Sequence, residues 1–213
     1  MLNQEQKIGF LLLSTFREEN LSKYTIQNLR GRLYIYEMIS TDNFQELETN
    51  RLHLRRLVET DWEMIRYLRS DKEVNQFVKR QPAETKEKAL AFIAKTNDDI
   101  DQGKLCQWCI AWNNSPVMIG NICLWNFSHD RKTAEVGYDL SPEFQGRGIM
   151  DEAMKAVINF GFNQLKLDLI EAFTNKQNES SKKLLLKNHY KWNASRMDPD
   201  DLDNIIYELH KPR

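Results

Sequence analysis

The sequence predicts a mixed α/β fold, with one domain over residues 46–213 behind an N-terminal extension of residues 1–45. Segments with the two-residue alternation of strands are interspersed with segments that repeat apolar residues every three to four positions, as helices do. No internal repeat, low-complexity stretch or Gly/Ser linker divides residues 46–213. A chain of 213 residues with 41% hydrophobic residues falls in the single-domain range and can bury a full core.

Alternation and periodicity assign the elements in order along the chain. They predict a strand over 51–57, helices over 60–70 and 84–100, strands over 106–113 and 117–127 joined by a turn at 113–115, a strand over 132–140, a helix over 148–164, a strand over 167–174, a helix over 179–187, and final strands near 190–195 and 203–210.

The expected helix 148–164 is amphipathic. Its polar positions Asp151, Lys155 and Asn159 face away from its apolar stripe. The stripe predicts that the helix packs on the sheet and that its N-terminus is held in place. The apolar side comprises Ala153, Val157, Phe160 and Gly161, with Met150, Met154 and Ile158 beside them.

The expected strand 132–140 has two different faces. Alternation places Ala134, Val136, Tyr138 and Leu140 on one face and Glu135, Gly137 and Asp139 on the other. Glycine inside a strand indicates either close approach of another backbone or ligand, or a β-bulge.

The N-terminal extension predicts a helix near 4–19 and a strand at 33–36. It lacks the basic leader and small-residue cleavage site of a signal peptide, and the charged run 17–19 follows its short apolar stretch. No run approaches the ~20 apolar residues that cross a bilayer. The extension is expected to pack on the domain, to cover a substrate cleft or to mediate homodimer formation, and a packed appendage is favoured.

Charge and cysteine content narrow the class of protein. A net charge of −1 gives no electrostatic reason to expect nucleic acid or an acidic membrane as a partner. Three cysteines argue against a disulfide framework and favour free thiols in a reducing cytoplasm. Cys106 and Cys109 have the spacing of a zinc pair, but residues three apart on a strand face opposite sides. The four histidines show no ligand spacing, so no metal is expected.

The segment Gln145-Gly146-Arg147-Gly148-Ile149-Met150 joins the strand 132–140 to the helix 148–164. Glycines that let the backbone curl, followed by the free N–H groups of a helix N-terminus, are typical of a phosphate-binding turn. A P-loop is excluded because Gly148 is not followed by Lys-Ser or Lys-Thr. A dinucleotide site fits poorly because Asp151 replaces its third glycine, although Glu171 lies at a suitable distance for the acidic residue. An ordinary strand-to-helix turn is the remaining alternative.

Three ordered segments resemble the GNAT acyltransferase superfamily, and within it the branch of the ribosomal-protein N-terminal (alanine/serine) acetyltransferases. They are the turn 145–150 followed by Asp151-Glu152-Ala153, the segment 178–190 beginning Asn-Glu-Ser-Ser, and the segment 47–55 with Asp61. The resemblance covers roughly residues 46–210. It implies a mostly antiparallel central sheet, splayed between its two middle strands and flanked by helices.

The resemblance also implies acetyl-CoA as co-substrate. Backbone groups of Tyr138, Asp139 and Leu140 would hold the pantetheine arm, and a bulge in this strand accompanies the splay in the family. The turn Gln145, Gly146, Arg147, Gly148, Ile149 and Met150 would bind the diphosphate. Asn178 and Ser181 would contact other parts of the cofactor.

Acyl transfer to an amine requires a base that keeps the amine neutral and a proton for the departing thiolate. Glu135 is the first candidate for the base, with a surface ion pair as the plain alternative, and Asp198, Asp200 and Asp201 are the runners-up. Ser181 is the candidate acid, although a helix cap or cofactor contact is the simpler role. In many members of the family a tyrosine protonates the thiolate, and the matching position here is Leu185. His189 stands where the family usually has the glycine before an aromatic residue.

Taken together, these features predict an acetyl-CoA-dependent N-acetyltransferase that transfers the acetyl group directly to a primary amine of a protein N-terminus or a small molecule. Direct attack is favoured because no Cys or Ser stands in an evident nucleophile–base arrangement. The aromatic residues Trp125 and Phe127 are expected in the core, and lining an acceptor pocket is the alternative role. A non-catalytic CoA-binding or interaction module is the alternative.

Overall fold

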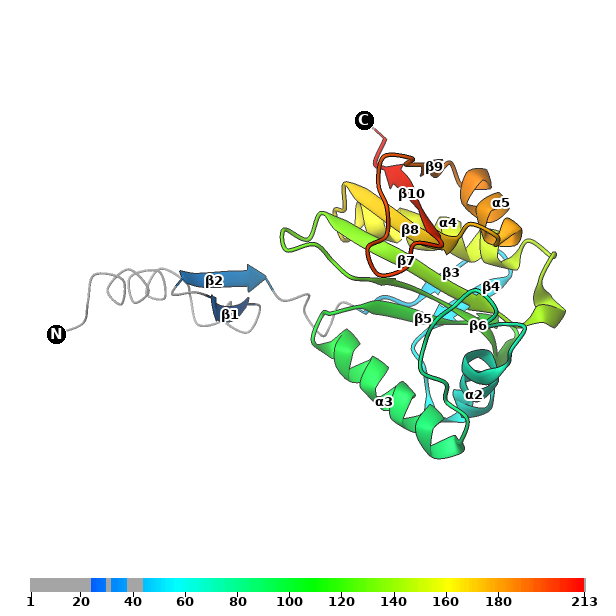
Figure 1. Cartoon of the computed structure of the whole chain (residues 1–213). Coiled ribbons are helices and arrows are strands. Elements are labelled where there is room, and N and C mark those ends of the chain that lie inside the picture. The colour runs from blue at the N-terminus through cyan, green and yellow to red at the C-terminus, as the bar shows by residue number, and fades with distance from the viewer. Residues whose placement is uncertain (1–23, 30–31, 38–43, 213) are drawn as a thin grey trace.

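The computed structural model of the protein describes residues 24–29, 32–37 and 44–212. The helix expected near 4–19 lies outside these residues. The strand expected at 33–36 is present as β2 (Arg32–Glu37), which pairs antiparallel with β1 (Tyr24–Leu29) in a two-stranded sheet of its own (Figure 1). The sequence did not predict β1.

The domain is built on an eight-stranded sheet, so the expected mixed α/β fold is confirmed. The strands lie in the order β3-β4-β5-β6-β7-β8-β10-β9, and β7–β8 is the one parallel pair among those described. Their bounds are β3 Leu47–Glu48, β4 Leu52–Arg55, β5 Cys106–Trp112, β6 Ser115–Trp125, β7 Thr133–Leu140, β8 Leu169–Asn175, β9 Lys191–Trp192 and β10 Asn204–His210. The short edge strand β3 is the element of this sheet that the sequence missed.

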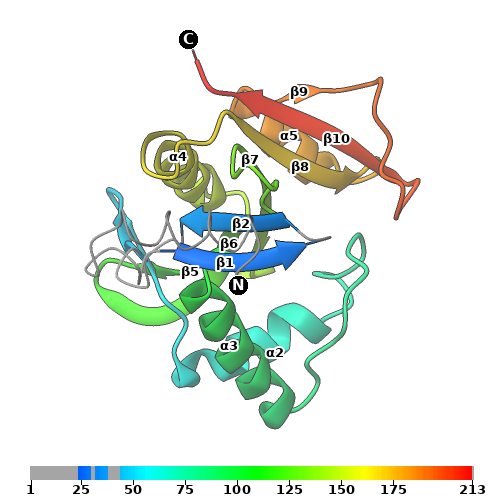
Figure 2. The same cartoon turned by 90° about the vertical axis from the view of Figure 1, so that its left-hand side faces the viewer.

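Two pairs of helices cover opposite faces of the sheet. Helices α2 (Trp62–Ser70) and α3 (Lys86–Asp101) lie on one face, and α4 (Ile149–Asn163) and α5 (Glu179–Lys187) on the other, as Figures 1 and 2 show. Short 3₁₀ helices η3 (Glu59–Asp61) and η4 (Pro142–Phe144) precede α2 and the glycine turn. Within the described residues, no helix combines the length and apolarity needed to cross a membrane.

Each helical layer has its own hydrophobic cluster. The α4 stripe is buried as predicted, with Ala153, Val157 and Phe160 in the larger cluster and Lys155 exposed. Gly161 lets α4 approach the sheet, because a Cβ there would lie 3.0 Å from Ile170 Cδ1. The smaller cluster joins α2 and α3 to the other face through residues of β5 and β6. Packing on the sheet therefore fixes the position of the α4 N-terminus.

The three cysteines are free thiols, as predicted. Cys106 belongs to the α4 cluster and Cys109 to the α2–α3 cluster, so the two face opposite sides of β5. Burial raises the pKa of Cys106, Cys109 and Cys123 to about 12. The thiolate is the reactive form, so all three thiols are chemically quiet near neutral pH.

The expected splay is confirmed between β7 and β8. These strands pair only from Thr133↔Leu169 to Glu135↔Glu171, whereas β7 stays paired with β6 from Glu135 to Leu140. The edge of β7 beyond Glu135 that faces β8 therefore has no β8 partner, which leaves room for an extended ligand.

Of the two roles considered for Gly137, the structure does not show the bulge. Gly137 keeps regular register opposite Cys123, and the register shifts lie between β5 and β6 at Ile110–Trp112 instead. A Cβ on Gly137 would lie 3.1 Å from Cys123 Sγ and 3.6 Å from Trp125 Nε1. The glycine therefore makes room for side chains of the neighbouring strand.

Candidate active site

The turn before α4 has the backbone geometry that its glycines predicted. Gly146 and Gly148 both adopt φ = 72°, in the left-handed region that non-glycine residues rarely enter. Gly148 is the N-cap of α4 and provides no side-chain cap. The Gln145 side chain donates to the Leu140 carbonyl at 3.0 Å and so ties the turn to the end of β7. The first N–H groups of α4 are thus presented without a side-chain cap, as an anion site requires.

Ion pairs hold this turn against the sheet and engage both carboxylates of the first helical turn. Glu152 accepts hydrogen bonds from Thr49 Oγ1 at 2.6 Å, Arg51 N at 2.9 Å and Arg51 Nε at 2.7 Å. Asp151 binds the amines of Lys155 at 2.9 Å and Lys187 at 3.0 Å. Because each carboxylate has cationic partners, the two acids oppose an incoming anion less than their formal charge implies.

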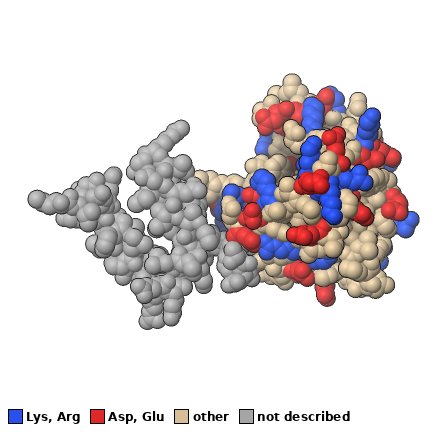
Figure 3. Space-filling view, turned by 90° about the horizontal axis from the view of Figure 1, so that it is seen from below, with Lys and Arg blue, Asp and Glu red and all other residues tan. Residues whose placement is uncertain are grey.

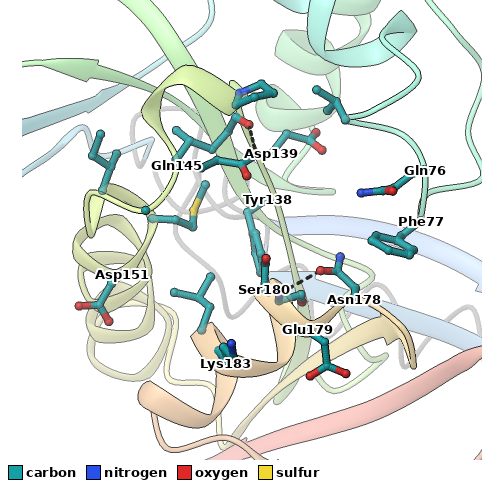
Figure 4. Close-up of a pocket in the computed structure, with 18 of the residues that line it drawn as sticks. Gln76, Phe77, Tyr138, Asp139, Gln145, Asp151, Asn178, Glu179, Ser180 and Lys183 are labelled. Atoms are coloured by element: carbon teal, nitrogen blue, oxygen red, sulfur yellow. Dashed lines mark hydrogen bonds between the residues drawn. The ribbon is translucent and has the colours of Figure 1, made fainter.

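The turn opens into a groove of about 630 Å³. It runs from the end of β7 past the turn to the start of α5, and residues 73–78 of the α2–α3 connection form its other wall (Figure 4). Apart from Arg147, every residue predicted to bind the cofactor lines it: Tyr138, Asp139, Leu140, Gln145, Gly146, Gly148, Ile149, Met150, Asn178 and Ser181. The guanidinium of Arg147 instead lies over the Phe144 ring, 5.8 Å from its centroid.

Asn178 and Ser181 have different structural roles at the start of α5. The Asn178 side chain is the N-cap and accepts from Ser181 N at 3.0 Å, so the cap role considered for Ser181 belongs to Asn178. The Ser181 hydroxyl lies 2.8 Å from Tyr138 Oη and accepts from Thr174 Oγ1 at 2.8 Å. Leu185 is fully buried. His189 adopts φ = 66° after the helix, the left-handed geometry expected where the family has glycine.

The Glu135 side chain lies on the face of β7 opposite to that of Tyr138, at the point where β7 and β8 begin to diverge. It stands beside Trp125 of β6 and Glu171 of β8 in register, and Asn126 Nδ2 donates to Glu135 Oε2 at a long 3.5 Å. Burial raises the pKa of Glu135 to about 7, and the negative charges of Asp198 and Glu171 add to this effect. A carboxyl group with a pKa near neutrality can accept a proton at physiological pH and release it again.

Two of the three alternative acids in the loop before β10 are engaged in local structure. Asp198 is buried and accepts from Asn204 Nδ2 at 2.8 Å and from Asp200 N at 2.9 Å. Asp201 pairs with Lys79 at 2.9 Å, and this bond lowers the pKa of its carboxyl group. Asp200 is exposed. The bonds of Asp198 and Asp201 are thus shorter than the 3.5 Å contact that Glu135 makes with Asn126.

The two candidate acceptor-pocket aromatics separate in the structure. Trp125 is 45% exposed and stands beside Glu135. Phe127 packs against the α4 cluster and lies under the Arg131 guanidinium, 4.1 Å from the ring centroid. Only Trp125 is thus next to the carboxylate. Among the residues that the structure describes, no group of His, Cys, Asp or Glu is arranged to hold a metal ion.

Sequence reasoning missed the residue that fixes the far wall of the groove. Arg80, in the α2–α3 connection, donates to Asp139 through Nη1 at 2.6 Å and Nη2 at 3.1 Å. It also donates to Asn75 Oδ1 at 2.6 Å and to the Leu68 carbonyl at 2.8 Å. Since the partners are 59 positions apart, no local pattern signals their contact. The pair joins the loop that carries residues 73–78 to the free end of β7.

Comparisons with known proteins agree with this geometry. Residues 51–191 match the family model described as the acetyltransferase (GNAT) domain. The chain is 29% identical over 175 residues to the uncharacterized N-acetyltransferase YoaA of Bacillus subtilis (strain 168), covering 80% of this chain and 99% of that protein. It is 30% identical over 141 residues to the uncharacterized N-acetyltransferase p20 of Bacillus licheniformis, covering 66% and 79%.

A solved structure shares the fold at low identity. It is a ribosomal L7/L12 α-N-protein acetyltransferase in complex with coenzyme A, with a TM-score of 0.68 and 18% identity. The match covers 78% of this chain and 98% of that one. At this level of identity, the likeness shows a shared fold and nothing beyond it.

Proposed function

Because the chain belongs to the GNAT acetyltransferase family, we propose that it transfers an acetyl group from acetyl-CoA directly to a primary amine. The observation that carries this proposal is the continuity of the groove: it links the unpaired edge of β7 to the glycine turn at the α4 N-terminus. One end suits a diphosphate and the other suits an extended, amide-containing arm.

In this proposal the N–H groups around Gly148 bind the diphosphate, and the backbone of Tyr138, Asp139 and Leu140 pairs with the pantetheine arm. The side-chain oxygen Oδ1 of Asn178 caps α5, which leaves the side-chain NH₂ group of Asn178 to donate to the cofactor. A β7 N–H near the thioester stabilises the oxyanion as the amine attacks. Metal ions have no part in the proposed chemistry.

Glu135 is the proposed base. It accepts a proton from the attacking amine on the face of the sheet that it shares with Trp125, its register partner on β6, so the acceptor approaches from that side. Figure 3 shows the face that carries α2 and α3, where cationic and anionic side chains are interspersed without a large area of one sign. This surface gives no electrostatic reason to expect a nucleic acid as the acceptor.

The acceptor class that we favour is a peptide N-terminus. The support is the fold shared with the ribosomal L7/L12 α-N-protein acetyltransferase, although small-molecule amines have the same reacting group. We further propose that the enzyme works in a reducing cytoplasm, since its three cysteines are unpaired.

The proposal is tested with the purified full chain. Acetyl-CoA at about 100 times its Kd is expected to raise the melting temperature by about 5 to 10 °C, whereas ATP and NAD leave it unchanged. Thiol release from acetyl-CoA should require an acceptor with a free amine, and peptides with blocked N-termini and no lysine serve as controls. Stabilisation by NAD or ATP instead of acetyl-CoA contradicts the cofactor assignment. Binding of acetyl-CoA without thiol release across peptides, polyamines and aminoglycosides would favour a non-catalytic module.

A further inference from the structure

Three hydroxyl groups from three different elements form a chain beside the groove. Tyr138 belongs to β7, Ser181 to α5 and Thr174 to β8. The distances are 2.8 Å from Tyr138 Oη to Ser181 Oγ and 2.8 Å from Thr174 Oγ1 to Ser181 Oγ. The chain therefore spans the gap where β7 and β8 diverge, and Figure 4 shows Tyr138 extending from β7 toward the start of α5.

One order of donors and acceptors in this chain leaves the Tyr138 hydroxyl free to donate outward. Thr174 donates to Ser181, and Ser181 carries a single hydroxyl hydrogen. Either oxygen can donate in the contact between Ser181 Oγ and Tyr138 Oη; when Ser181 donates, its hydrogen goes to Tyr138 Oη. The phenolic hydrogen of Tyr138 is then free for a partner in the groove, which Tyr138 lines. Consecutive hydrogen bonds in a buried chain also polarise one another and strengthen the terminal donor.

Tyr138 and Glu135 project from opposite faces of β7. Tyr138 shares its face with the buried residues Ala134 and Val136, which pack against α4, and Glu135 shares the other face with Gly137. A cofactor that runs from the turn at Gly148 along β7 reaches Tyr138 before Glu135. The attacking amine and the departing sulfur thus meet different side chains on different sides of the strand.

Building on the proposed acetyl transfer, we propose that the Tyr138 hydroxyl donates a hydrogen bond to the sulfur of coenzyme A as the thioester breaks, with Ser181 and Thr174 as positioning residues. In this step the amine nitrogen forms a bond to the acetyl carbon, the C–S bond breaks, and its electron pair stays on the sulfur. The amine proton goes to Glu135, and the thiolate takes a proton from water when it leaves.

Tyr138 acts as a hydrogen-bond donor and keeps its proton. Burial raises the pKa of its phenol to about 12, well above the ~8.5 of an ordinary thiol, so complete transfer to the thiolate is unfavourable. The α5 position that matches the tyrosine of related enzymes is the buried Leu185, which has no hydroxyl group. In this chain a donor on β7, and not one on α5, stabilises the negative charge that develops on the sulfur.

The test is the dependence of turnover on the leaving thiol. Tyr138→Phe is expected to lower kcat with acetyl-CoA by about 10- to 100-fold, the effect of losing a hydrogen bond to a charged group, with CoA affinity within about threefold of the wild type. The deficit should shrink when the cysteamine arm of the acetyl donor is fluorinated beside the sulfur, because a less basic thiolate needs less stabilisation. Ser181→Ala should change kcat in the same direction by a smaller factor.

Tyr190→Phe is the matched control. Tyr190 is also a buried tyrosine on the α5 side, but its hydroxyl contacts Met154 Sδ at 3.9 Å and does not line the groove. It should show no dependence on the leaving thiol. If Tyr138→Phe lowers kcat equally with acetyl-CoA and the fluorinated donor, or does not lower it, the proposed role of Tyr138 is wrong. The proposed acetyl transfer itself would still stand. Failure of the wild-type protein to acetylate any amine overturns this inference together with the proposed function.

Discussion

Glu135→Gln is expected to lower kcat by about 10²- to 10⁴-fold at neutral pH, the range for removing a general base, with CoA affinity within about twofold. Glutamine keeps the shape of the side chain and its place beside Trp125 and Glu171, but it cannot take a proton from the attacking amine. The measurement is kcat and KM by thiol release, with CoA affinity determined by calorimetry. An unchanged kcat would remove Glu135 as the base.

The dependence of activity on pH provides a second test of Glu135 as the base. The base is active when deprotonated, and the pKa of Glu135 is raised to about 7, mainly by burial. Activity of the wild-type protein should therefore rise as pH increases through about 7, and this limb should be lost in Glu135→Gln. Glu171→Gln removes one of the neighbouring charges that raise the pKa, so it should move the limb to lower pH.

The same raised pKa makes a separate prediction about stability. Between the unfolded value near 4.5 and the folded value near 7, the folded protein binds the proton more tightly, so stability is lost as pH rises through this window. At pH 8 the charged carboxylate is a penalty that glutamine avoids. Glu135→Gln should therefore be more stable than the wild type at pH 8 by about 1–3 kcal/mol, after allowance for partial exposure.

Chemical denaturation at pH 8 and pH 5 measures this difference. The gain should be smaller at pH 5, where Glu135 is largely protonated in the folded protein. The exposed strand residue Glu48 provides the control, since Glu48→Gln removes a carboxylate of the same sheet outside the site. Greater stability with lower activity is the combination expected when a functional carboxylate is replaced. If the stability gain of Glu135→Gln over the wild type is the same at pH 8 and pH 5, the burial argument is wrong.

Gly148→Asp is expected to weaken CoA binding by about 10- to 100-fold, because a carboxylate would face the diphosphate within a few ångströms. Among the described residues, an added Cβ meets only Arg51 Nη2, at 3.8 Å, so space is available and the obstacles are charge and the positive φ of 72°. Gly148→Asn separates them. Asparagine has nearly the same shape and tolerates left-handed geometry comparably, but carries no charge.

Calorimetric titration with CoA at low and high salt measures both variants. The asparagine variant should bind within a few-fold of the wild type, and the deficit of the aspartate variant should shrink at high ionic strength because salt screens the repulsion. Equal affinity of the wild type and both variants would show that the diphosphate binds elsewhere. Equal losses in both variants would assign the effect to backbone strain.

Much of the site could be predicted because its signals are local. The turn geometry follows from Gly146 and Gly148, and the α4 stripe and the two faces of β7 follow from periodicity alone. The amphipathic pattern of this helix determines which of its faces packs on the sheet.

The features that the sequence missed depend on contacts between distant segments. The Arg80–Asp139 pair and the Tyr138–Ser181 hydrogen bond join residues 59 and 43 positions apart. The raised pKa of Glu135 depends on burial and on Asp198, which a separate loop supplies. The sequence left close approach and a bulge as alternatives for Gly137, because the side chains that need its space belong to β6.

The central claim is that the N–H groups near Gly148 hold the diphosphate of coenzyme A while its arm runs along β7. A crystal structure of the protein with coenzyme A tests this directly. The diphosphate oxygens should lie about 2.7–3.2 Å from backbone nitrogens within residues 146–150, with the arm hydrogen-bonded to residues 138–140. A cofactor bound outside the groove, with these nitrogens making no contact to it, would contradict the claim.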